Sequence, residues 1–272
     1  MTILEEIAAH KRREVADRQA LYPVKLLEKS LYFNTPVVSL RQYLQRPDRL
    51  GIIAEFKRKS PSKGAINPTA SVESVSIGYM QAGASALSVL TDPDYFGGKN
   101  EDLTTARTFN FCPILRKDFT VDEYQIVEAR SIGADAILLI AEILEAVQVK
   151  SLARFAKSLG LEVLLEIHSV DQLDKWTPDV DVIGVNNRDL HRFEVRVDTS
   201  GALFSQLPTE SVRISESGLN DPAVVAELLE VGYEGFLIGE HFMRDAEPPA
   251  ACRQFIQQVY RLRGNTPQPI EL

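Results

Sequence analysis

The feature that most constrains the fold is a regular alternation of short apolar runs with longer segments of helical periodicity. From residue 50 onward there are eight such runs, each rich in Val, Ile or Leu and too short for a core helix: Gly51–Phe56, Ala86–Leu90, Pro113–Arg116, Ala136–Ile140, Glu162–Ile167, Val182–Asn186, Val212–Ser215 and Gly235–Gly239. Alternating strands and helices require parallel pairing with right-handed crossovers, and eight units can close into a barrel.

We therefore expect an α/β fold, a (β/α)8 TIM barrel with an N-terminal helical extension. A doubly wound open sheet is the competing topology. The barrel is favoured because the repeats fill the chain and no glycine-rich dinucleotide fingerprint follows the first run. The expected divisions are a helical extension packed on the barrel over residues 1–48, a single barrel domain over residues 49–264 and a tail over residues 265–272.

The first segment predicts an amphipathic helix over residues 2–20. Its apolar side chains follow helical spacing at Ile3, Leu4, Ile7, Ala8 and Val15. Charged residues interrupt the segment from residue 5 onward, so we expect neither a signal peptide nor a membrane span. Shorter helical pieces are expected over residues 26–31 and 38–44.

Charge and cysteine content exclude several classes of function. The formal net charge is -8 and the isoelectric point is about 5.2, which argues against nucleic-acid binding because that surface needs a basic stripe. Cys112 and Cys252 are the only cysteines, and two thiols in apolar surroundings form neither a metal site nor a disulfide framework. The pattern indicates a cytoplasmic protein without a metal.

Charged residues end the first apolar run. Glu55 and Lys57 are two residues apart, so in a strand both project from the interior face while Phe56 points outward. An acid and a base at that end of the strand suit an anionic substrate. For an isolated Glu-x-Lys pair, however, a solvated ion pair is the usual explanation.

The other strand ends strengthen the case for a site, because catalysis in such barrels occurs where the strands end. Those ends offer an amine, two carboxylates, an amide and a guanidinium group at Lys117, Glu166, Glu216, Asn186 and Arg188, without a metal-ligand spacing of His and Cys. After the seventh and eighth runs, Ser217, Gly218 and Gly239 place small residues where barrels often bind phosphate. We expect one site for a phosphorylated small molecule.

Longer motifs then make the chain recognisable. The segment from Glu55 to Ser62, Glu-Phe-Lys-Arg-Lys-Ser-Pro-Ser, resembles the signature of the indole-3-glycerol phosphate synthase family of tryptophan biosynthesis. The resemblance includes the helical extension and continues through Pro113–Phe119, Leu165–Ser169, residues 184–190, Ser215–Gly218 and Ile238–Gly239. It implies that the chain converts 1-(2-carboxyphenylamino)-1-deoxyribulose 5-phosphate into indole-3-glycerol phosphate, carbon dioxide and water, without a cofactor.

The resemblance also implies roles for the residues. Lys117 is expected to be the general acid at the substrate ketone, and Lys57 to hold the carboxylate and assist dehydration. Glu166 is expected to transfer protons at the reacting centre and Glu55 to hold Lys57, although the division among these three stays open. The implied substrate and phosphate contacts are Ser60, Phe96, Phe119, Asn186, Arg188, Glu216, Ser217, Gly218 and Gly239.

Two features and two alternatives remain open at this stage. Glu240 occupies a position that some relatives fill with a small hydroxyl residue, and the loop over residues 92–98 is a candidate lid. A phosphoribosyl isomerase or a non-enzymatic phosphosugar-binding barrel would share the phosphate site. We expect no membrane or nucleic-acid partner, and either a monomer or a weak homo-oligomer.

Overall fold

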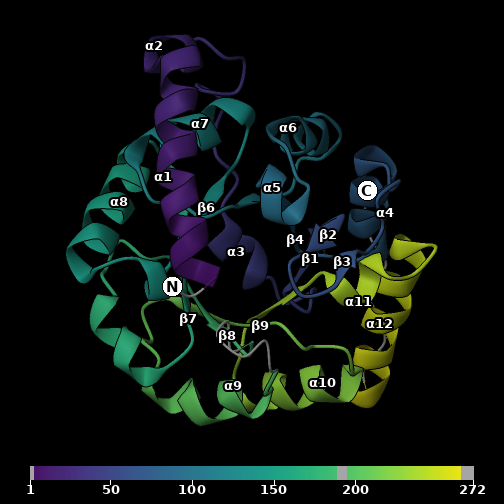
Figure 1. Ribbon diagram of the computed structural model, residues 1–272. Coiled ribbons are helices and arrows are strands. Elements are labelled where there is room, and N and C mark those ends of the chain that lie inside the picture. Colours follow the sequence, from purple (N-terminus) through teal and green to yellow (C-terminus); the bar gives the residue numbers. More distant parts are fainter. Residues whose placement is uncertain (1–2, 189–194, 265–272) are drawn as a thin grey trace.

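The computed structural model describes residues 3–188 and 195–264, which form a closed barrel of parallel strands surrounded by helices (Figure 1). Strands adjacent in the barrel follow the order of the chain, apart from a small separate hairpin, and β1 pairs with β10 to close the ring. The barrel strands are β1 Ile52–Phe56, β4 Ala86–Leu90, β5 Ile114–Lys117, β6 Ala136–Ile140, β7 Glu162–Ile167, β8 Val182–Asn186, β9 Val212–Glu216 and β10 Gly235–Ile238. The expected TIM barrel is confirmed.

The two faces of each strand have different surroundings. In β1, Ile52, Ala54 and Phe56 belong to the apolar layer between barrel and helices, whereas Ile53 belongs to a second core inside the barrel. Glu55 and Lys57 share the inward face with Ile53, because side chains alternate along a strand. In β1 the outward face is thus apolar throughout, and the inward face becomes polar only at the carboxyl end of the strand.

Most crossovers are helical as predicted. The helices and helical turns that follow the strands are α4 Val72–Ala82, α5 Pro93–Phe96, α6 Asn100–Phe109, α7 Glu123–Ile132, η1 Ala141–Ile143, α8 Ala146–Ser158, η2 Val170–Lys175, α9 Asp198–Leu203, η3 Phe204–Gln206, α10 Pro222–Val231, α11 Glu240–Met243 and α12 Pro248–Leu262. Asp122 and Asp221 are the N-caps of α7 and α10, and Gly133 ends α7 with a positive φ of 95°.

Two local features differ from the expected pattern. The crossover from β7 to β8 is the 3-10 helix η2 rather than an α-helix. The polar segment after β1 contains a short antiparallel hairpin, in which β2 (Lys59–Ser60) pairs with β3 (Gly64–Ala65). Hydrogen bonds between these two short strands give the loop above β1 a defined shape.

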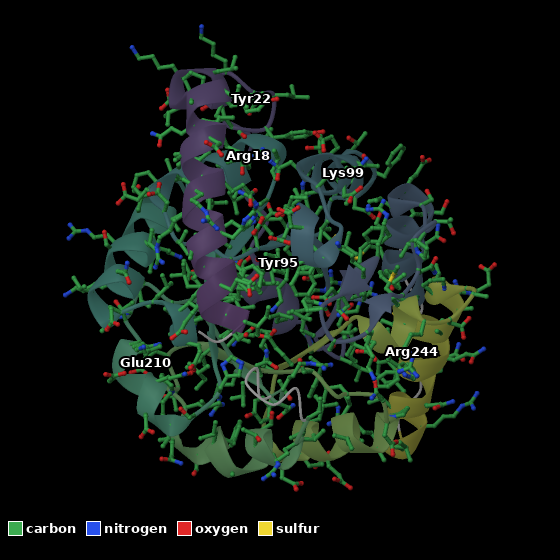
Figure 2. The ribbon with its side chains drawn as sticks, viewed as in Figure 1. Arg18, Tyr22, Tyr95, Lys99, Glu210 and Arg244 are labelled. Atoms are coloured by element: carbon green, nitrogen blue, oxygen red, sulfur yellow. The ribbon has the colours of Figure 1, made fainter. Side chains whose placement is uncertain are left out.

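The N-terminal extension covers both ends of the barrel. Helix α1 (Ile3–Leu21) places Leu4 and Ile7 on the apolar core inside the barrel, beside residues near the carboxyl ends of the strands. Helix α2 (Val24–Leu27) lies against α7, and α3 (Leu40–Leu44) contributes Leu40 and Leu44 at the opposite end. Arg18 and Tyr22 lie towards the C-terminal end of α1, whereas Tyr95 lies near its N-terminal half (Figure 2).

Residue 2 of the predicted first helix and the predicted tail over residues 265–272 lie outside the described residues. Cys112 and Cys252 are buried as free thiols. In the described part of the chain, no helix is both long enough and apolar enough to cross a membrane.

Candidate active site

The polar strand ends surround one cavity of about 650 Å³ at the carboxyl end of the barrel. Every residue that the sequence singled out for the site lines this cavity: Glu55, Lys57, Ser60, Phe96, Lys117, Phe119, Glu166, Asn186, Arg188, Glu216, Ser217, Gly218 and Gly239. Strands far apart in the sequence thus converge on one pocket. Its shape and mixed lining are typical of a small-molecule site.

Lys117 forms the centre of the polar cluster. It ends β5, and its Nζ lies 2.8 Å from Glu166 Oε2 of β7 and 2.9 Å from Glu216 Oε2 of β9. An ammonium group has three N–H bonds, and these two carboxylates accept two of them. The third N–H can serve a bound molecule.

The two carboxylates around Lys117 differ in their remaining partners. Glu166 also accepts a hydrogen bond from Asn186 Nδ2 at 2.9 Å, and His168 Nε2 lies 3.6 Å away. Glu216 Oε1, in contrast, is buried without a hydrogen-bond partner among the described residues. Two buried acids that share one cation do not ionise equally, so the less well-hydrogen-bonded Glu216 is the one that holds a proton more readily.

The pKa values follow this asymmetry. Burial, reinforced by the negative charges of Glu166 and Glu55, raises the pKa of Glu216 to about 7 although Lys117 opposes the shift. Burial also acts to raise the pKa of Glu166, but Lys117 and His168 outweigh it and the pKa falls to about 2. Burial alone would lower the pKa of Lys117; the carboxylates of Glu166, Glu216 and Glu55 reverse this, so its pKa is raised.

Glu55 and Lys57 form the predicted pair on β1, with 2.7 Å between Glu55 Oε1 and Lys57 Nζ. Two of the carboxylates that face the barrel interior, Glu55 and Glu216, have room only because glycines lie beside them. A Cβ added at Gly239 would overlap Glu55, and a Cβ added at Gly184 would overlap the Glu216 carboxylate. These glycines leave the space into which the acidic side chains fold.

The aromatic residues lie on another side of the cavity. The ring centroids of Phe96 and Phe119 are 5.9 Å apart with an interplanar angle of 39°. Phe96 belongs to α5, whose N-cap Asp92 accepts hydrogen bonds from the backbone N–H groups of Tyr95 and Phe96. The candidate lid over residues 92–98 therefore contains a capped helical turn, and its role as a lid stays a prediction.

The predicted phosphate residues lie around the ends of β9 and β10. Ser60 Oγ is buried and has no hydrogen-bond partner in the part of the chain that the structure describes. Arg188 approaches Glu240, with 3.3 Å between Nη2 and Oε2, and Arg244 approaches the other oxygen of Glu240 at 3.2 Å. The carboxylate of Glu240 is thus neutralised by two guanidinium groups that also line the cavity.

Sequence reasoning missed a buried residue that shapes this end of the site. Asn187 Nδ2 donates to the carbonyl oxygens of Glu216 and Ser217 at 3.0 and 3.1 Å, and its Oδ1 accepts from Ser200. Ser217 has a φ of 67°, a conformation that is uncommon for a residue other than glycine. Asn187 holds this unusual turn in place. The Asn-Asn-Arg sequence drew attention only to its neighbours.

Helix α1 also contributes to the cavity, which periodicity alone did not reveal. Ile3, Leu4 and Ile7 line it, opposite the strand ends. Their spacing predicted an apolar helix face but not the surface that this face covers. Within residues 3–188 and 195–264, no group of three or more His, Cys, Asp or Glu side chains is arranged to hold a metal.

Comparisons with known proteins agree with this geometry. The family described as "Indole-3-glycerol phosphate synthase" matches residues 4–255. The chain is 46% identical over 257 residues to a Bacteroides thetaiotaomicron protein named indole-3-glycerol phosphate synthase, covering 94% of this chain and 98% of that protein.

Solved structures show the same architecture at much lower identity. Thiamine phosphate pyrophosphorylase from Pyrococcus furiosus has a TM-score of 0.58 at 14% identity, over 81% of this chain and 99% of that chain. 3-Hexulose-6-phosphate synthase from Salmonella typhimurium has a TM-score of 0.58 at 10% identity, over 78% and 99%. At such identities the likeness shows the fold alone.

Substituting Gly184 tests whether the Glu216 carboxylate must stay where it is. The methyl group of Gly184→Ala would push the carboxylate away from Lys117. Because a misplacement of about 1 Å can cost about 100-fold in rate, we expect turnover to fall by roughly that factor. Gly201→Ala is the matched control, since a Cβ there meets nothing within 4 Å. Turnover of Gly184→Ala equal to that of the control would contradict the interpretation.

The raised pKa of Glu216 predicts a pH dependence of stability. Between its ordinary 4.5 and about 7, the folded protein binds more protons at Glu216 than the unfolded chain does. The free energy of unfolding should therefore fall as pH rises through this window, by an amount of order 3 kcal/mol at about 1.4 kcal/mol per pKa unit. Urea unfolding of wild type and Glu216→Gln across pH 4.5–8 measures the difference. If Glu166→Gln removes the slope instead, the proton has been assigned to the wrong carboxylate.

Proposed function

The chain belongs to the indole-3-glycerol phosphate synthase family, and from this we propose how the residues around its cavity close an indole ring. The enzyme is a carboxy-lyase of tryptophan biosynthesis. It converts 1-(2-carboxyphenylamino)-1-deoxyribulose 5-phosphate into indole-3-glycerol phosphate, carbon dioxide and water. The observation that carries the assignment of roles is Lys117, a largely buried cation held by two carboxylates in the cavity.

Ring closure is the step assigned to Lys117. The aromatic carbon that bears the carboxylate attacks the ribulose ketone, and negative charge develops on the ketone oxygen. The third N–H of Lys117 can stabilise this charge and then protonate the oxygen, since an alkoxide is a stronger base than an amine. Glu166 and Glu216 keep Lys117 charged until the oxygen becomes basic enough to take the proton.

Decarboxylation then restores the aromatic ring. The carbon–carboxylate bond breaks, carbon dioxide leaves, and its electron pair returns to the ring system. The electron demand of the ring-closed intermediate drives this loss, so no cofactor is required as an electron sink. We assign Lys57, held by Glu55 at 2.7 Å, to the substrate carboxylate before it leaves.

Dehydration completes the reaction. Lys57 protonates the departing hydroxyl group, and Glu166 removes a proton from the carbon between the nitrogen and the new ring bond. Lys117 keeps the pKa of Glu166 low and its carboxylate ionised at neutral pH; once Lys117 has given its proton to the ketone oxygen, that lowering is lost and Glu166 becomes basic enough to accept the proton. The 2.8 Å contact with Lys117 allows it to return the proton there. Two protons are delivered and one removed, so one net proton enters as the carboxylate leaves as neutral carbon dioxide.

The remaining contacts position the substrate. Phe96 and Phe119 are proposed to hold the aromatic ring. Asn186, Glu216 and Ser217 line the sugar, while Ser60 and the backbone at Gly218 and Gly239 receive the phosphate. We assign Arg188, together with Lys57, to the substrate carboxylate through its planar fork, and its ion pair with Glu240 must loosen for that contact.

The setting of the enzyme is part of the same proposal. We place it in the cytoplasm, because Cys112 and Cys252 are buried free thiols that suit a reducing compartment. Its partner is the phosphorylated substrate, without nucleic acid or membrane. We propose a monomer or a weak homo-oligomer.

Direct assay tests the reaction. Adding the carboxyphenylamino-deoxyribulose phosphate to purified protein in a chelating buffer should give a saturable rise in indole fluorescence. Turnover under these conditions supports both the reaction and the lack of a metal requirement. Folded protein that binds the substrate without turning it over would contradict the proposal and favour a binding barrel.

Replacing Lys117 tests its assignment as the general acid. Lys117→Met removes both the proton donor and the charge that stabilises the alkoxide, so we expect turnover to fall by several orders of magnitude. The matched control is Lys150→Met on the exposed surface of α8, which should leave turnover unchanged. A Lys117→Met enzyme within tenfold of wild type would refute the assignment.

A further inference from the structure

Helix α1 carries a lysine in the middle of its buried face. Lys11 is only 1% exposed, and its position continues the stripe formed by Leu4, Ile7, Ala8 and Val15. Such a stripe ordinarily consists of apolar residues, because a buried charge is costly unless it is paired. A lysine at this position therefore requires an explanation in terms of its partners.

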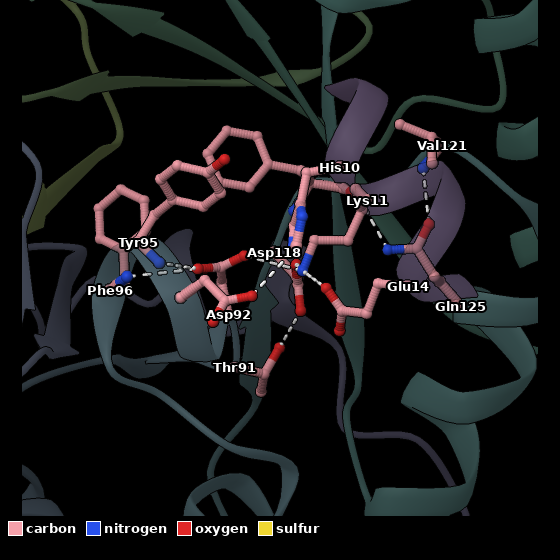
Figure 3. A network of polar contacts seen from close by, with 12 residues as sticks. His10, Lys11, Glu14, Thr91, Asp92, Tyr95, Phe96, Asp118, Val121 and Gln125 are labelled. Carbon is pink, nitrogen blue, oxygen red and sulfur yellow. Dashed lines mark hydrogen bonds and ion pairs between the residues drawn. The ribbon is translucent and has the colours of Figure 1, made fainter. Parts of the chain in front are cut away.

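Three carboxylates surround the ammonium group of Lys11 (Figure 3). Its Nζ lies 2.7 Å from Glu14 Oε2 on the same helix, 2.8 Å from Asp92 Oδ2 and 3.0 Å from Asp118 Oδ1. Asp92 follows β4 and Asp118 follows β5, so a single cation joins α1 to two neighbouring strand ends. Both aspartates are almost completely buried.

The two aspartates also hold the backbone of Phe96 and Phe119, which form the aromatic wall of the cavity. Asp92 Oδ1 accepts the N–H of Phe96 at 3.2 Å, and Asp118 Oδ1 accepts the N–H of Phe119 at 2.8 Å. Lys11 therefore bridges the two side chains that fix Phe96 and Phe119, whose rings pack at 5.9 Å and line the cavity. Asp92 connects Lys11 to Phe96, and Asp118 connects it to Phe119.

Electrostatics makes the bridge necessary. Without Lys11, two buried carboxylates would face one another near the cavity wall, and like charges in a poorly solvated site repel strongly. Burial acts to lower the pKa of Lys11, but Asp118, Asp92 and Glu14 outweigh it, so the pKa is raised and the amine stays charged. Burial likewise acts to raise the pKa of Asp118, but Lys11 and Arg116 keep it lowered.

We propose that Lys11 is a positioning residue for substrate binding: by bridging Asp92 and Asp118, it sets the spacing of Phe96 and Phe119 and so shapes the pocket for the substrate's aromatic ring. The inference rests on the proposed function for the identity of that ring. It assigns to the N-terminal helix a part in ring recognition, through a residue that does not itself line the cavity.

The competing explanation is that Lys11 only fastens α1 to the barrel. Arg18 offers a matched control, because it lies seven residues further along α1 and also pairs with a buried barrel carboxylate. Its Nε lies 2.7 Å from Glu128 Oε1. Arg18→Met removes an anchor of α1 without touching either aspartate of the wall.

The experiment compares Lys11→Met with Arg18→Met using two probes that do not depend on turnover. Anthranilate (2-aminobenzoate) reports the ring pocket through its own fluorescence, and inorganic phosphate reports the other side of the cavity. For Lys11→Met we expect anthranilate binding to weaken at least tenfold, KM for the full substrate to rise by a similar factor, and phosphate binding to stay within twofold. Arg18→Met should destabilise the fold without changing either affinity.

Each outcome decides a separate question. Equal losses of anthranilate affinity in both variants, or an unchanged affinity in Lys11→Met, would overturn the positioning role. If Lys11→Met does not fold, Asp92→Asn replaces it: the amide oxygen still caps Phe96, but the charge that draws Lys11 is gone, and the same pattern should appear. Wild-type protein that binds anthranilate but lacks turnover would refute the proposed reaction while the affinity comparison still tests Lys11.

Discussion

The site depends on one largely buried cation that holds two carboxylates. Lys117 joins Glu166 on β7 with Glu216 on β9, and among the described residues neither acid has another cation as close. Removing the ammonium would leave two like charges in a water-poor cavity, where a broken buried pair commonly costs about 3–5 kcal/mol. The two acids around this cation differ in protonation: Glu166, which has more hydrogen bonds, stays ionised, whereas Glu216 keeps a proton more readily.

A barrel supplies this arrangement only where its interior is not filled. Inward-facing Leu, Ile and Val close most of the barrel, but acids replace them at the carboxyl end. Those acids need room: Gly184 on β8 leaves it for Glu216 on the adjacent β9, and Gly239 just after β10 leaves it for Glu55 on the adjacent β1. The glycines leave the space and the carboxylate side chains fill it, so the positions of the glycines determine where the charges can lie.

The sequence predicted those features that local periodicity encodes. Alternation along a strand placed Glu55 and Lys57 inside and Phe56 outside, and the eight apolar runs predicted the barrel closely. Contacts between distant segments carry no such local signal. Asn187 has polar neighbours like any loop residue, and only the fold brings its amide against the carbonyls of Glu216 and Ser217. The sequence also did not predict the 3-10 helix η2 between β7 and β8, because a short polar segment fits either kind of helix.

Lys11 had a visible signal whose meaning depended on tertiary structure. A lysine within an apolar helical stripe indicates a buried partner, but the sequence does not identify it. In the fold, Asp118 contacts Lys11 and also Arg116, Arg116 pairs with Glu128, and Glu128 pairs with Arg18 of the same helix. Ion pairs thus start and end on α1 and include the two residues that flank Lys117 in the sequence. Apolar packing alone could hold the helix, whereas directional pairs also fix its register over the aromatic wall.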